Sequence, residues 1–153
     1  MSTAADTTAV TNLITTYAEL VDAGDFTGVG ALFANATFTS SGTTITGGEN
    51  LEKMFRATVI LYDDGTPRTH HATTNIAIEF DDESHIATAR SYFTVFQALP
   101  DLPLQPIAAG RYIDHFTRLD NDWSFMERQV HITLAGNLSH HLRTEPRRIA
   151  AED

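Results

Sequence analysis

Cysteine is absent from this chain, so disulfide bonds and thiolate chemistry are excluded. Basic residues are also scarce, because ten Lys and Arg stand against twenty Asp and Glu and the formal net charge is −10. A chain with this charge lacks the electrostatic footprint that a phosphate backbone requires. We therefore expect neither nucleic acid nor an anionic membrane surface as a partner.

Targeting signals, long apolar runs and metal-binding spacings are missing as well. The N-terminus, MSTAADTTAV, has no basic segment followed by an apolar one, and no run approaches the length of a membrane span. The seven histidines include no i, i+4 pair, so the sequence predicts no metal site. We expect a soluble cytoplasmic protein.

Helical periodicity marks the first sixty residues or so. Apolar side chains fill one arc of a helical wheel over residues 8–23, and Gly24 follows this predicted helix. The other elements predicted in this half are a short helix capped by Asp25, a strand over 36–40, a turn-rich connection over 41–48, a helix over about 51–61 and a loop over 62–68.

Beyond residue 68 the apolar period becomes two. Four long strands are predicted over residues 69–80, 86–98, 107–119 and 123–135, and the second and third are joined by the loop PDLPLQP. Short connections favour antiparallel neighbours, so we expect an α+β fold with helices packed on one face of a long, mainly antiparallel sheet. The predicted domain is single and spans 1–153, with an ordered core over about 8–142 and a frayed tail over 143–153.

Two adjacent histidines open the first long strand, in the stretch THHATTN. Successive side chains of a strand point to opposite faces, so His70 and His71 cannot serve the same site. Strict alternation places His71 with Asn75 on one face, unless a bulge shifts the register. The opposite, outer face then carries His70, Ile76, Ile78 and Phe80. An apolar face of this size predicts a homodimer.

Charged residues at two other positions point to buried chemistry. Arg128 shares a strand face with aliphatic residues, so it needs an anionic or carbonyl partner among buried groups, and Asp114 is one candidate. Asp22 lies near the C-terminal end of the first helix, where the helix dipole raises its proton affinity unless a donor offsets it. A histidine Nδ1–H would be such a donor, and the pairing would leave Nε2 free to take a proton.

The stretches YAELVD, HATTN and GRYIDHFTRLDNDWSFMER, in this order, resemble the SnoaL-like division of the NTF2-like superfamily over residues 8–142. Its members are cone-shaped α+β barrels and include scytalone dehydratase, bile-acid 7α-dehydratase and hexachlorocyclohexane dehydrochlorinase. The family pattern falls on Asp22, on His71 with Asn75, and on Arg128, and it selects His71 over His70. Tyr17 stands where the bile-acid enzyme also has tyrosine. Aligned pocket-lining positions are Phe38, Tyr112 and Ile132.

This resemblance implies a cofactor-independent lyase or isomerase. His71, oriented by Asp22, would abstract a proton from a hydrophobic polycyclic, steroid-like or polyketide-like molecule. Arg128 and Tyr17 would stabilise the negative charge that develops. The alternative is a non-catalytic ligand-binding or oligomerisation domain of the same fold, in which the Asp–His pair is structural. Some relatives form trimers, so a trimer is the alternative to the homodimer.

The remaining histidines carry weaker expectations. His115 and His131 take the opposite strand parity from the site residues and are predicted to face away from the pocket. His140 and His141 would close one end of the barrel or lie at a subunit contact. The role of Asp114 beyond a possible ion pair is left open by the sequence.

Overall fold

The computed structural model describes residues 2–144, which form three helices and one six-stranded sheet. The helices are α1 (Ala4–Asp22), α2 (Phe26–Leu32) and α3 (Gly48–Thr58). The strands are β1 (Thr37–Ser40), β2 (Thr43–Thr46), β3 (Thr69–Asp81), β4 (Ile86–Leu99), β5 (Leu102–Leu119) and β6 (Asp122–Ala135). Within residues 2–144, no helix is long and apolar enough to cross a membrane.

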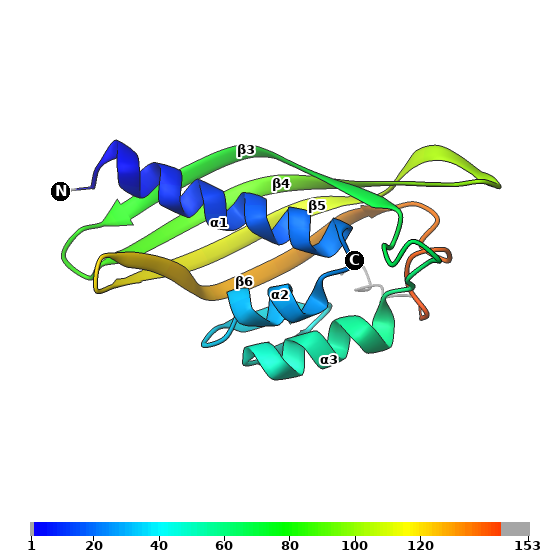
Figure 1. The fold of residues 1–153 in the computed structure, drawn as a ribbon. Helices are drawn as coiled ribbons and strands as arrows, with labels where there is room; N and C mark the ends of the chain where they lie inside the picture. Colours follow the sequence, from blue (N-terminus) through cyan, green and yellow to red (C-terminus); the bar gives the residue numbers. More distant parts are fainter. Residues whose placement is uncertain (1, 145–153) are drawn as a thin grey trace.

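The sheet has the strand order β2-β1-β6-β5-β4-β3. Strands β3 to β6 follow one another as antiparallel neighbours, whereas β1 runs parallel to β6. Figure 1 shows α1 lying along the long strands, with α2 and α3 grouped together below β6. The prediction of helices packed on a long, mainly antiparallel sheet is confirmed, and the sheet is mixed and open rather than closed into a barrel.

Several element boundaries differ from the prediction. Helix α1 starts four residues earlier because Thr3 and Asp6 form a capping box: Thr3 Oγ1 accepts from the Asp6 backbone N–H, and the Asp6 carboxylate accepts from the Thr3 N–H. Strand β2 lies inside the predicted turn-rich connection, and β5 begins within the predicted proline-bearing loop. The predicted frayed tail lies largely outside the described residues, and the single-domain assignment stays a prediction.

A β-bulge in β3 changes the predicted faces of this strand. The register with β4 shifts between Thr74 and Ala77, where Asn75 adopts a φ of 54°. Ile78 and Phe80 therefore lie opposite the fully buried Ala89 and Ala87, on the core side of the sheet. The prediction that these two residues form an apolar outer face is wrong. The homodimer remains a prediction, now without this support.

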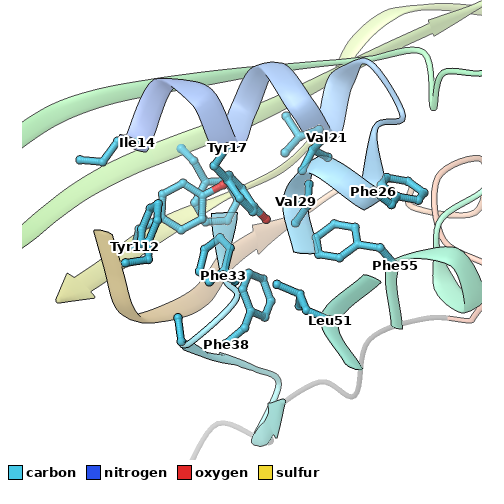
Figure 2. Packing of buried hydrophobic residues seen from close by; sticks show 14 of the residues in the cluster. Ile14, Tyr17, Val21, Phe26, Val29, Phe33, Phe38, Leu51, Phe55 and Tyr112 are labelled. Carbon is cyan, nitrogen blue, oxygen red and sulfur yellow. The ribbon is translucent and has the colours of Figure 1, made fainter. Parts of the chain in front are cut away.

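Aromatic rings fill the space between α1 and the sheet. Tyr17 lies at the centre of this core, with ring centroids 5.9 Å from both Phe33 and Tyr112 and 6.2 Å from Phe38. Figure 2 shows these rings together with Phe55 beneath α1. The core thus positions the C-terminal end of α1 over the starting residues of β3.

Helices α2 and α3 meet through two glycines. A Cβ atom added at Gly48 would lie 1.8 Å from the carbonyl oxygen of Gly30, a distance that no real contact allows. Both helices contribute to the buried core, so their spacing is fixed by the absence of these two side chains.

We predict that Gly48→Ala destabilises the protein by roughly 1–3 kcal/mol, because α2 and α3 must separate to admit the methyl group. Denaturant unfolding measures the change. Glu49→Ala, at the next and exposed position of α3, is the matched control and should leave the stability nearly unchanged. Equal stability of Gly48→Ala and the wild type would contradict the close helix contact.

Candidate functional site

Asp22, the last residue of α1, binds the first residues of β3. Its carboxylate accepts three hydrogen bonds: from Thr69 Oγ1 at 2.8 Å, from the His71 backbone N–H at 2.7 Å and from His71 Nδ1 at 2.6 Å. A carboxylate oxygen accepts, so His71 Nδ1 carries the donated proton in this pair. The ring nitrogen Nε2 is then left as the acceptor, which is the tautomer a general base requires.

The environment of Asp22 keeps its carboxyl group ionised. Burial acts to raise the pKa of Asp22, but the hydrogen bonds and charge of His71 and the Thr69 hydroxyl together lower it below its usual value. These donors offset the effect expected from the helix C-terminus. The Asp22 side chain is 22% exposed and the His71 side chain 7%, so the pair lies at the edge of the core rather than in its middle.

Arg128 forms a second polar group deeper in the core. It lies opposite Asp114 across β5 and β6, and both side chains are fully buried. Nε and Nη2 of Arg128 donate to the two Asp114 carboxylate oxygens at 2.7 and 2.9 Å, a bidentate pair. Burial acts to lower the pKa of Arg128, but the charge and hydrogen bonds of Asp114, together with the two neighbouring tyrosines, outweigh it and raise this pKa. Nη1 has no hydrogen-bond partner among the described residues.

Two tyrosine rings enclose the Arg128 guanidinium. Its Cζ atom lies 3.7 Å from the ring centroid of Tyr112 and 4.4 Å from that of Tyr17. Burial raises the pKa of Tyr17 to about 12 and raises that of Tyr112 well above its usual value, although the Arg128 charge opposes both shifts. Both phenols are therefore neutral at neutral pH and are able to donate hydrogen bonds.

The residues predicted to line a pocket do not all converge. Phe38 and Tyr112 lie in the aromatic core, 4% and 2% exposed, whereas Ile132 is 38% exposed near the end of β6. Asn75 does not accompany His71. It lines a cavity of about 260 Å³ that it shares with Arg90 and Arg111, two exposed residues of β4 and β5. The bulge explains this difference, because Asn75 occupies the irregular position itself.

Two predicted outward-facing histidines lie on the face opposite the buried ion pair. His115 lies opposite Glu127 in the pairing of β5 with β6, and its Nδ1 is 3.4 Å from a Glu127 carboxylate oxygen. His131 lies opposite the exposed Arg111. Among residues 2–144, no three His, Asp or Glu side chains converge as metal ligands.

Sequence reasoning missed three residues around the Asp22–His71 pair. Thr69 shares the parity of His71 within β3, so strand alternation alone would have placed it there. Gln97 is buried in the same region because it lies opposite Thr69 in the pairing of β3 with β4. His141 is buried near His71 through the path of the chain after β6. Burial and the neighbouring His71 lower the pKa of His141 to about 4.

A SnoaL-like domain model matches residues 2–129, so the chain belongs to the SnoaL-like family. This confirms the resemblance found in the sequence. A comparison with curated protein sequences finds no match.

Solved structures with the same fold include proteins of several kinds. A protein of unknown function from Mycobacterium tuberculosis has a TM-score of 0.71 and 21% identity, covering 88% of this chain and 80% of its own. A protein assigned as a scytalone dehydratase from Novosphingobium aromaticivorans has a TM-score of 0.69 and 22% identity, with coverages of 86% and 87%. The hexachlorocyclohexane dehydrochlorinase LinA-type3 from Novosphingobium barchaimii has a TM-score of 0.68 and 20% identity, with coverages of 86% and 89%. At these identities the likeness establishes the fold.

We predict that Asp22→Asn weakens the acid dependence of folding stability. The pKa of Asp22 is lowered in the folded state, so its contribution is present above the unfolded value of about 3.9 and is lost as the pH falls through the folded value. Urea unfolding from pH 5 to pH 2.5 should show a smaller loss of unfolding free energy in the variant than in the wild type. Identical losses would contradict a lowered pKa.

We predict that Asp114→Ala costs about 3–5 kcal/mol, because it leaves the Arg128 charge buried without a partner. The double variant Asp114→Leu/Arg128→Met should recover most of this loss. Denaturant unfolding of the wild type and the two variants measures this recovery. A double variant no more stable than Asp114→Ala would show that the two residues do not act as a pair.

Proposed function

We propose that this protein is a cofactor-independent lyase or isomerase that removes a proton from carbon in a hydrophobic, polycyclic small molecule of the steroid-like or polyketide-like kind. The observation that carries the proposal is the hydrogen bond of 2.6 Å between His71 Nδ1 and Asp22 Oδ1. It holds the imidazole in one tautomer and leaves Nε2 without a hydrogen bond to any described residue.

In this reaction His71 Nε2 takes a proton from a carbon next to a carbonyl or a leaving group. The resulting imidazolium is stabilised by the Asp22 carboxylate, and a neutral Tyr17 donates a hydrogen bond to the oxygen on which negative charge develops. The Arg128 guanidinium, stacked on the Tyr17 ring, favours charge on that hydroxyl by its field. Loss of a leaving group completes a lyase reaction, whereas return of the proton to another carbon completes an isomerisation.

Family membership supports the same reaction class. Two of the structural relatives are named as a dehydratase and a dehydrochlorinase, and both names denote elimination reactions. A positioned base contributes about 10²–10⁴ in rate, so the remaining acceleration falls to Tyr17 and the other donors of the interior. Within the same proposal the chain acts as a single domain, without metal or organic cofactor, and as a homodimer or trimer in the cytoplasm.

A second candidate is a non-catalytic ligand-binding or oligomerisation domain. The buried ion pair favours this candidate, because two of the three Arg128 nitrogens donate to Asp114 and aromatic rings enclose the guanidinium. Such contacts are those of a structural ion pair. In that case the Asp22–His71 contact would serve only to join α1 to β3.

Hydrogen–deuterium exchange on carbon distinguishes the two candidates. We predict that the protein in D₂O accelerates the loss of α-proton NMR signals from one or more cyclic ketones in a panel of two to four fused rings. His71→Ala should lower this rate by at least about 10²-fold, because the base is removed.

The matched control is His70→Ala, one residue away on the exposed outer face, which should retain the wild-type rate. The melting temperature of His71→Ala should stay close to that of the wild type. Exchange that is equally fast in His71→Ala would exclude His71 as the base, and a panel without any exchange would favour the binding domain.

A further inference from the structure

Gln97 lies one step along the sheet from His71. In the pairing of β3 with β4, His71 is opposite Val95 and Thr69 is opposite Gln97. Gln97 and Val95 both point into the core, 1% and 5% exposed. Diagonal neighbours of this kind are about 7–8 Å apart, so the Gln97 side chain belongs to the same region of the interior as the Asp22–His71 pair.

The Gln97 amide is oriented by two carbonyl groups. Its Nε2 donates to the Pro67 carbonyl at 3.1 Å and to the His140 carbonyl at 3.0 Å. Carbonyl oxygens only accept, so these contacts identify the nitrogen and leave Oε1 as the other end of the amide. Oε1 is buried and has no hydrogen-bond partner among residues 2–144.

His141 directly follows His140, whose carbonyl accepts a hydrogen bond from Gln97. Its own N–H donates to the Leu138 carbonyl at 3.0 Å, and its carbonyl accepts from the Ile60 N–H at 2.9 Å. The residue is 9% exposed, and Nδ1 is buried without a partner in the described part of the chain. Burial, together with the nearby His71, lowers the pKa of its imidazole to about 4, so the ring is neutral at neutral pH.

Two buried polar atoms without hydrogen-bond partners in one small region lower the free energy of unfolding. Each costs about 1–3 kcal/mol when it is left unsatisfied, and native structures retain few of them. One of these atoms is Oε1 of Gln97, the diagonal neighbour of His71. The other is Nδ1 of His141, whose preceding residue, His140, accepts a hydrogen bond from Gln97 through its carbonyl. A ligand hydroxyl that reached both atoms would satisfy them.

We propose that Gln97 Oε1 and His141 Nδ1 form a subsite that binds a hydroxyl group of the ligand held at the Asp22–His71 pair. The inference rests on the proposed function and narrows its substrate class to hydroxyl-bearing, uncharged ring compounds. The hydroxyl donates its proton to Gln97 Oε1 and accepts from His141 Nδ1–H. A carboxylate does not fit, because it cannot donate to Oε1 and finds no positive charge on a neutral imidazole.

Binding of two matched probes tests this subsite. 2-Naphthol and 2-methylnaphthalene differ in one group, a hydroxyl in place of a methyl. By calorimetry or ligand-observed NMR at pH 7, we expect the wild type to bind 2-naphthol about tenfold more tightly, the effect of about one buried hydrogen-bonded hydroxyl. Equal affinities, or no saturable binding of 2-naphthol, would overturn the proposal.

Substitutions at residue 141 then test whether His141 causes the preference for 2-naphthol over 2-methylnaphthalene. His141→Leu should reduce the tenfold preference to less than about twofold, whereas His141→Gln, which keeps a polar donor, should restore part of it. His140→Leu is the matched control and should keep the full preference, since its side chain is not part of the subsite. A tenfold preference that persists in His141→Leu would overturn the proposal.

Stability separates a binding role from a core role. Removing a buried, unpartnered polar atom should leave the melting temperature of His141→Leu equal to or above that of the wild type. A melting temperature more than about 10 °C lower would mark His141 as a core residue and overturn the proposal. Hydrogen–deuterium exchange on carbon is a separate measurement. If the protein shows no exchange that depends on His71, catalysis is refuted, and the preference for the hydroxyl group is still judged by binding alone.

Discussion

The Asp22 carboxylate joins the end of α1 to the start of β3, and the rest of the site depends on this junction. Three donors converge on it, and one of them is the backbone N–H of the residue whose ring it also orients. The same contacts that align helix and strand therefore fix the imidazole of His71. Because structure and chemistry share these hydrogen bonds, the discriminating experiments have to separate a change in rate or binding from a change in stability.

Two polar pairs accompany the aromatic core, one at its edge and one inside it. The outer one, Asp22 with His71, is partly open, whereas the inner one, Arg128 with Asp114, is closed and stacked between tyrosine rings. The inner pair has no exposed surface, so in the proposed reaction it acts on the substrate only through the neutral hydroxyl of Tyr17. The proposed reaction takes its base and its hydrogen-bond donor from these side chains.

The sequence predicted the order and type of nearly all elements because helical and strand periodicities are strong in this chain. It also predicted the Asp22–His71 contact, from a carboxylate at a helix end and a family pattern. The bulge at Asn75 was not predictable from alternation, and it reversed the faces of Ile78 and Phe80. A second bulge has a similar effect. Counting strictly from the turn after β5 would pair Asp114 with Glu127, and only the shift near Met126 brings Asp114 opposite Arg128.

The protonation state of the His71 ring tests the proposed role of Asp22 most directly. Nitrogen-15 NMR of the imidazole at neutral pH distinguishes the two neutral tautomers through the chemical shifts of Nδ1 and Nε2. We expect a protonated Nδ1 and an unprotonated Nε2 in the wild type, with this preference lost in Asp22→Asn. A proton on Nε2 in the wild type, with Nδ1 bare, would contradict the claim that Asp22 prepares His71 to act as a base.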